Sequence, residues 1–232
     1  MTKKDILELQ SLLAQPKLIV IVSHKNPDGD AIGSSLALAD YLRQKKHDVS
    51  VIMPNDFPDF LKWLPGSDTV LFYDKDQETC DNIINDAALI FTLDFNALSR
   101  VDTMESVLKK SDATFVMIDH HQAPDTYATY MYSDPSICAT AQMVYHFLEM
   151  MQDTAMITRE IAENLYTGIM TDTGSFRFSS TTSVTHRVVA ELIDKGIDNA
   201  KIHQAVFDAN SPERMQLLGV ALQNLKILPE YK

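Results

Sequence analysis

The sequence predicts an α/β protein with a doubly wound, mainly parallel sheet and helices on both faces of that sheet. Three short apolar runs, at residues 18–22, 88–93 and 114–118, show no alternation with polar side chains, which is typical of strands buried on both faces. Each of the first two runs is followed by a polar loop and then by a segment with helical spacing. This repeated order of strand, loop and helix predicts parallel strands joined by crossover helices.

The first half of the chain supplies the predicted sheet. Residues 4–13 have apolar side chains at helical spacing, and Pro16 ends this helix before the first strand. The loop after that strand contains Pro27 and Gly29, and residues 32–42 return to helical spacing. The further expected elements are, in chain order, strand 48–53, strand 69–73, helix 79–84, strand 88–93, a helix at 102–110 with Asp102 as its N-cap, and strand 114–118.

The second half of the chain is predicted to be helical beyond residues 133–135. A break made by Thr171, Thr173 and Gly174 follows one of these helices, and Gly196 ends another at the C′ position. The expected helices are 140–151, 159–170, 183–195, 201–207 and 212–225.

The composition excludes several classes of protein. With 232 residues, 45% of them hydrophobic and 22% charged, the chain is typical of a globular protein. Its apolar runs are too short to span a bilayer and its first ten residues lack the core of a signal peptide, so we expect a cytoplasmic protein with no membrane partner. Cys80 and Cys138 show no CxxC spacing, which argues against a zinc site or a disulfide framework. The formal charge of −12 argues against duplex DNA as a partner, so an anionic substrate must be small or held by local cations.

Four separate segments place carboxylates or imidazoles at the ends of predicted strands or helices. They are His24 with Asp28 and Asp30, then Asp94, then Asp119 with His120 and His121, and finally Asp172. Open α/β sheets bind ligands at the carboxyl ends of their strands. Carboxylate oxygens with a few imidazoles suit Mn²⁺ or Mg²⁺, and two such ions that share a carboxylate would lie about 4 Å apart, as in two-metal phosphoryl enzymes. The pattern therefore predicts hydrolysis of a phosphate ester.

Structural roles compete with this interpretation at each position. Aspartates that follow strands are common as helix caps and Asx turns, so Asp94 or Asp172 alone would indicate little. A single histidine likewise favours a structural role. The coincidence of an HxxxDxD loop and a DHH tripeptide at two strand ends favours the metal site.

These segments resemble the four motifs of the DHH-superfamily phosphoesterases. The matching residues are His24-Lys-Asn-Pro-Asp28-Gly-Asp30-Ala-Ile-Gly-Ser, the strand end at Asp94, Asp119-His120-His121, and Thr171-Asp172-Thr-Gly-Ser-Phe. The runs TDTGSFRFSSTT and THRVVAELIDKGID are most similar to the nanoRNase/pAp-phosphatase branch. Members of that branch degrade short oligoribonucleotides and dephosphorylate 3′-phosphoadenosine 5′-phosphate (pAp), so the resemblance implies a hydrolase of this type.

The resemblance also implies a role for each motif residue. One Mn²⁺ would be held by His24, Asp28 and Asp94, and a second by Asp30, Asp94, His120 and Asp172, with Mg²⁺ or Co²⁺ as possible substitutes. Asp94 would bridge the ions, Asp119 would orient the imidazoles, and His121 would face the substrate phosphate. The catalytic residues implied are Asp94, Asp119, His120 and His121, acting on short single-stranded RNA or a small nucleotide. The family further suggests a homodimer.

Two residues outside the motifs are candidates for substrate binding. Arg177 follows Asp172 by five residues and is expected either to contact a phosphate or to form a surface ion pair. His186 begins an amphipathic helix and is expected either to lie near the substrate or to be exposed.

Residues 1–210 are expected to form the catalytic domain, and residues 211–232 an interdomain linker helix. Members of the branch carry a second, DHHA1-type domain with a glycine-rich motif, and we expect that domain to be absent from this chain.

Alternatives to the predicted activity are an inorganic pyrophosphatase or a single-strand exonuclease on the same scaffold. A non-catalytic regulatory domain that binds metal is a third possibility.

Overall fold

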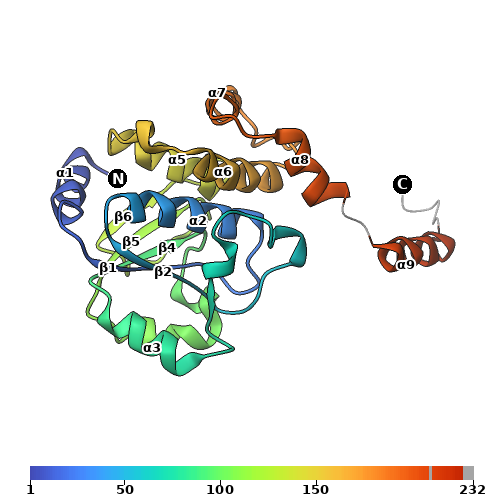
Figure 1. The fold of residues 1–232 in the computed structure, drawn as a ribbon. Coiled ribbons are helices and arrows are strands. Elements are labelled where there is room, and N and C mark those ends of the chain that lie inside the picture. Colours follow the sequence, from blue (N-terminus) through green and yellow to red (C-terminus); the bar gives the residue numbers. More distant parts are fainter. Residues whose placement is uncertain (209–210, 227–232) are drawn as a thin grey trace.

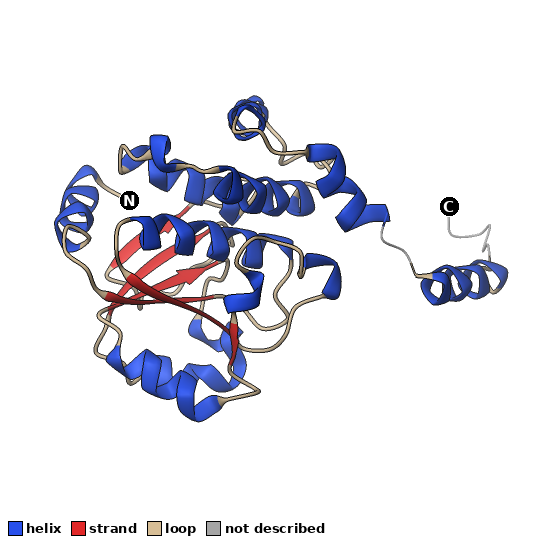
Figure 2. Ribbon diagram, viewed as in Figure 1, coloured by secondary structure: helices blue, strands red, loops and turns tan. Residues whose placement is uncertain are grey.

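A six-stranded sheet forms the centre of the protein, as seen in a computed structural model that describes residues 1–208 and 211–226. Within this part of the chain the strand order is β3-β2-β1-β4-β5-β6, and every neighbouring pair is parallel (Figures 1 and 2). The strands are β1 (Leu18–Val22), β2 (Asp48–Met53), β3 (Leu71–Phe72), β4 (Leu89–Leu93), β5 (Thr114–Asp119) and β6 (Tyr130–Ser133). The predicted doubly wound α/β fold is confirmed.

Helices cover both faces of the sheet (Figure 1). On one face lie α2 (Gly29–Gln44) and α5 (Thr140–Met150), with α6 (Arg159–Asp172) packed against both and α1 (Lys3–Leu12) beside them. On the other face lie α3 (Gln77–Asp86), the 3₁₀ segment η3 (Leu98–Met104) and the short α4 (Glu105–Leu108). Because side chains alternate along a strand, Ile19 and Ile21 join the first core and Val20 and Val22 the second. Each face therefore has its own apolar core.

The last helices continue away from the sheet. They are α7 (Ser183–Asp194), α8 (Asn199–His203), which runs into a π-helical turn at Gln204–Asp208, and α9 (Pro212–Gln223). In Figure 1, α9 lies apart from the sheet. Residue 210, where the predicted catalytic domain ends, lies outside the described residues. Residues 227–232, the end of the predicted linker, also lie outside them. In the described ranges, no helix combines the length and the apolar character that crossing a membrane needs.

Several predicted elements differ from the structure. Strand β6 was not predicted, because this short edge strand is half-buried and lacks a long apolar run. In the predicted strand 69–73 only Leu71–Phe72 pairs with β2, because a 3₁₀ turn occupies Ser67–Thr69.

The predicted helix at 102–110 is also wrong. Asp102 has φ of 53° and divides η3 instead of capping a helix, and α4 covers only Glu105–Leu108. The carboxylate of Asp102 instead accepts a hydrogen bond from Nζ of Lys25 at 2.6 Å. The helix expected at 201–207 is divided between α8 and the π-helical turn.

Candidate metal centre at the carboxyl edge of the sheet

The predicted metal ligands meet where the strand order reverses. The chain runs from β1 through β2 to β3 in one direction and then crosses back to β4 on the other side of β1, which leaves a crevice beyond the carboxyl ends of β1 and β4. His24 follows β1, Asp94 follows β4, and Asp119 is the last residue of β5. The fold thus brings segments distant in sequence to a single edge of the sheet.

The loop after β1 presents His24 and begins α2. Asp28 is the N-cap of α2, and its Oδ1 accepts the backbone N–H groups of Asp30 at 3.0 Å and Ala31 at 3.1 Å. The backbone N–H of Lys25 donates to the carbonyl of Arg100 at 2.9 Å, which ties this loop to η3. Asp28 therefore starts the helix, and the hydrogen bond from Lys25 holds the loop beside η3.

Asp94 lies between two imidazoles. Its Oδ2 is 3.5 Å from Nε2 of His24, and its Oδ1 is 3.4 Å from Nε2 of His120. The residue has φ of 64°, a left-handed conformation that aspartate tolerates better than most residues and that is often found at functional sites. The two carboxylate oxygens of Asp94 thus face different partners.

His120 connects Asp94 with two further carboxylates. Its Nε2 lies 3.6 Å from Oδ2 of Asp172, at the end of α6, and 4.0 Å from Oδ2 of Asp30, near the start of α2. Its Nδ1 lies 3.2 Å from the carbonyl oxygen of Ile137, which leaves Nε2 turned toward the carboxylates. Possible ligand atoms lie within 4.8 Å of one another in three groups, which are His24 with Asp28 and Asp94, Asp30 with His120 and Asp172, and Asp94 with His120 and His121.

Asp119 orients His121. The buried Asp119 carboxylate has its Oδ1 2.7 Å from Nδ1 of His121, whose side chain is 37% exposed. The other oxygen, Oδ2, is also buried and has no hydrogen-bond partner among the described residues. The predicted orienting role of Asp119 fits the geometry at His121.

The ionisable groups of this cluster perturb one another strongly. Burial raises the pKa of Asp30, and the charges of Asp94 and Asp172 raise it further. Burial likewise raises the pKa of Asp172 to about 6. Burial alone would lower the pKa of His120, but the hydrogen bond to Asp94 and the charges of Asp30 and Asp172 outweigh it and raise that pKa to about 10. Because several negative charges lie close together, this cluster binds protons more readily than isolated carboxylates do. A divalent cation bound there would neutralise the same charges.

In the described part of the chain His186 does not join the three groups of ligand atoms, and Arg177 is not a residue type that ligates a metal. Nε of Arg177 donates to the carbonyl of Gly174 at 2.6 Å, and the exposed ring of His186 packs against Phe176 with 5.9 Å between centroids. Their predicted roles in substrate binding stay predictions. Nearby, Phe178 is 56% exposed, whereas Phe176 is partly buried against the core.

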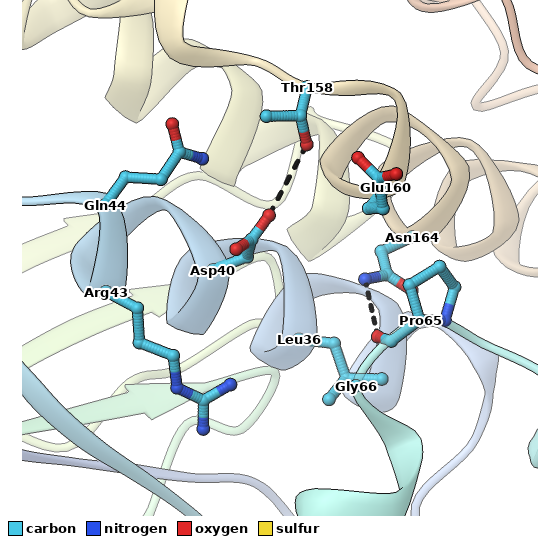
Figure 3. A pocket seen from close by; sticks show the side chains of 9 residues that line it. All are labelled: Leu36, Asp40, Arg43, Gln44, Pro65, Gly66, Thr158, Glu160 and Asn164. Carbon is cyan, nitrogen blue, oxygen red and sulfur yellow. Dashed lines mark hydrogen bonds between the residues drawn. The ribbon is translucent and has the colours of Figure 1, made fainter.

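Of two cavities, one lies beside a residue that contacts the metal centre and the other lies away from it. One of about 420 Å³ lies beside the 134–138 loop and is lined by residues that include Ile137, whose carbonyl contacts His120, and Cys138. Another, of about 300 Å³, lies between the second half of α2 and the first half of α6 (Figure 3). There Asn164 donates to the carbonyl of Pro65 at 3.1 Å and the Thr158 hydroxyl lies 3.4 Å from Asp40. Because Asp30 and Asp172 lie at the opposite ends of these helices, the second cavity is separate from the metal centre.

Sequence reasoning placed the start of α5 correctly at Thr140 but missed its contacts with the candidate ligands. The backbone N–H groups of Thr140 and Ala141 donate to Asp30, and the Thr140 hydroxyl donates to Asp94. One signal was available, because Ala139 at the N-cap position cannot cap a helix with its own side chain. The missing cap indicates that a group from elsewhere in the chain takes its place.

Comparison with known proteins gives matches over most of the chain. Residues 18–169 match the model of the DHH family, N-terminal domain. The bifunctional oligoribonuclease and PAP phosphatase NrnA of Thermus thermophilus is 34% identical over 209 residues, which are 89% of this chain and 59% of that protein. The chain spans about three fifths of the length of the NrnA proteins of Thermus thermophilus and Bacillus subtilis.

Solved structures share the fold. An exopolyphosphatase-related protein from Bacteroides fragilis is 41% identical, with a TM-score of 0.97, and the match covers 99% of this chain and 68% of that one. The crystal structure of exonuclease RecJ bound to manganese is 14% identical, with a TM-score of 0.54, over 89% of this chain and 55% of that one. This second likeness is one of fold alone.

Proposed function

Because this chain belongs to the DHH family, we propose that it is a two-metal phosphoesterase that hydrolyses short oligoribonucleotides to mononucleotides and removes the 3′-phosphate of pAp. One observation carries the proposal: four aspartates and two histidines from separate segments converge beyond β1 and β4, with Asp94 between the two sets. A carboxylate in that position can serve both ions of a pair. The related NrnA proteins, named for these two activities, support the choice of substrates.

The residues present fit a pair of hard divalent cations. One ion would be held by His24, Asp28 and Asp94, and the other by Asp30, Asp94, His120 and Asp172. Aspartate and imidazole ligands without a thiolate favour Mn²⁺, with Mg²⁺ or Co²⁺ as possible substitutes. The crowding of buried carboxylates supports this assignment, since a cation would relieve their mutual repulsion.

The protein's own groups would position the substrate. Two bound ions would supply an activated water and neutralise charge on the phosphate. His121 would turn Nε2 toward the substrate phosphate, because Asp119 engages its Nδ1. Arg177 and His186 are proposed as further contacts to the substrate, both lying near the segment that follows Asp172.

The proposed substrates are small, in keeping with an acidic protein. A net charge of −12 disfavours a long nucleic acid, whereas a dinucleotide or pAp brings few charges and would meet them at the metal centre. Short single-stranded RNA and small nucleotides are therefore the proposed partners. A homodimer and a cytoplasmic location remain predictions.

The test is Mn²⁺-dependent hydrolysis of a diadenylate dinucleotide and of pAp by this chain, with products identified and the reaction repeated in EDTA. Release of AMP from both substrates, stopped by EDTA and restored by Mn²⁺, is the expected result. A Mn²⁺-loaded protein that hydrolyses inorganic pyrophosphate but neither nucleotide would overturn the assignment of substrates.

A further inference from the structure

The first turn of α5 is capped by a carboxylate from another helix. Ala139 occupies its N-cap position and supplies no side-chain acceptor. Instead, the backbone N–H of Thr140 donates to Oδ2 of Asp30 at 2.6 Å, and that of Ala141 donates to Oδ1 of Asp30 at 2.8 Å. Both oxygens of Asp30 are thus held at the N-terminal end of α5.

The side chain of Thr140 contacts the other key carboxylate. Its hydroxyl donates to Oδ1 of Asp94 at 2.9 Å, and both residues are buried. A threonine inside a helix often bonds to the carbonyl four residues earlier, as Thr167 does with Glu163 at 2.8 Å. At the first position of α5 no such helical carbonyl precedes Thr140, so its hydroxyl is available to Asp94.

The contact sets the rotation of the Asp94 carboxylate. With Oδ1 held by Thr140, that oxygen faces Nε2 of His120 at 3.4 Å and Oδ2 faces Nε2 of His24 at 3.5 Å. Each oxygen is thereby directed toward one of the two sets of ligand atoms. Without the hydroxyl, a buried carboxylate oxygen would lose its donor and the carboxylate could turn.

We propose that Thr140 is a positioning residue, which fixes Asp94 through its hydroxyl and Asp30 through its backbone N–H so that both metal positions form together. The inference rests on the proposed two-metal function. Thr140 would act through these carboxylates, to which its backbone N–H and its hydroxyl donate. Outer contacts of this kind change metal affinity by about 10–100-fold.

The experiment compares variants at one position by their binding of Mn²⁺ alone, measured as free Mn²⁺ by electron paramagnetic resonance. Thr140→Val keeps the shape and the backbone donor but removes the hydroxyl, Thr140→Ala removes hydroxyl and methyl, and Thr140→Ser keeps the hydroxyl. Thr167→Val is the matched control, because Thr167 is equally buried and its hydroxyl bonds within its own helix. Circular dichroism checks that each variant is folded.

The expected result is a Kd for Mn²⁺ that rises by about 10–100-fold in Thr140→Val and Thr140→Ala and stays near the wild-type value in Thr140→Ser and Thr167→Val. If Thr140→Val does not fold, the difference between the alanine and serine variants decides. Wild-type affinity in folded variants without the hydroxyl would overturn the role of Thr140 and leave the proposed function standing. A wild-type protein that binds no Mn²⁺ would overturn both.

Discussion

Gly33 of α2 lies directly against the backbone of Asn164 in α6: a β-carbon at position 33 would be 2.4 Å from the Asn164 carbonyl oxygen. This close approach lets the two helices pack so that the start of α2, with Asp28 and Asp30, meets the end of α6 at Asp172. The metal centre therefore depends on a glycine that carries no chemistry.

Gly33→Ala is expected to destabilise the protein by about 1–3 kcal/mol, because overpacking against a backbone outweighs the helix propensity of alanine. Urea unfolding measures the change, and Mn²⁺ affinity should fall with it as Asp30 and Asp172 separate. The control is Gly219→Ala in α9, where a β-carbon would meet nothing within 4 Å. Equal stability of the wild type and Gly33→Ala would contradict the tight packing of α2 and α6.

Asp94→Asn is expected to bind neither ion and to lose hydrolysis, because the proposal assigns this one carboxylate to both ions. Asp28→Asn should lose only the ion held with His24, since asparagine still caps α2 and Asp30, His120 and Asp172 are untouched. Counting bound Mn²⁺ by equilibrium dialysis distinguishes the two. An Asp94→Asn variant that retains two ions would rule out a bridging position.

Substitutions of the two adjacent histidines are expected to have different effects. His120→Asn should weaken Mn²⁺ binding, because Nε2 of His120 lies among three carboxylates. His121→Asn should keep its Mn²⁺ and lose about 100-fold or more in kcat, since its ring would act on the substrate. Steady-state kinetics with metal titration tests this. Unchanged kcat in His121→Asn would remove it from the proposed site.

Asp153 is expected to stabilise the protein near neutral pH, far from the metal centre. Burial alone would raise the pKa of Asp153, but hydrogen bonds from Lys45 at 2.7 Å and Tyr41 at 2.5 Å outweigh it and lower the pKa below its usual 3.8. A lowered pKa means that the stabilisation is present above the unfolded-state value and is lost as pH falls through the folded-state value. Asp153→Asn should therefore cost about 1–2 kcal/mol at pH 7 and progressively less below pH of about 4.

Urea unfolding of the wild type and Asp153→Asn at several pH values measures that difference. Glu105→Gln is a suitable control, because Glu105 pairs with Lys109 and both side chains are more exposed than those of Lys45 and Asp153, so that this ion pair adds little. A difference in stability between wild type and Asp153→Asn that stays constant down to pH of about 2 would contradict the lowered pKa.

The local sequence pattern was sufficient to predict the strands that are buried on both faces. The apolar strands at 18–22, 89–93 and 114–119 are recognisable because both their faces are covered, and the polar residues that follow them were placed correctly at one sheet edge. Strand β6 was not recognisable, because a half-buried edge strand has no such run. Asp102 was misread as a helix cap because its partner, Lys25, lies far away in the sequence.

The sequence by itself determined the α/β class, the parallel order of strand and helix, and the set of candidate ligands from His24 to Asp172, because these depend on side-chain type and short-range periodicity. Only the tertiary structure decided that Asp30 caps α5 and that Thr140 donates to Asp94. These contacts join residues through helix packing and individual side-chain rotations. No local pattern encodes such contacts, because their partners are chosen by the packed fold as a whole.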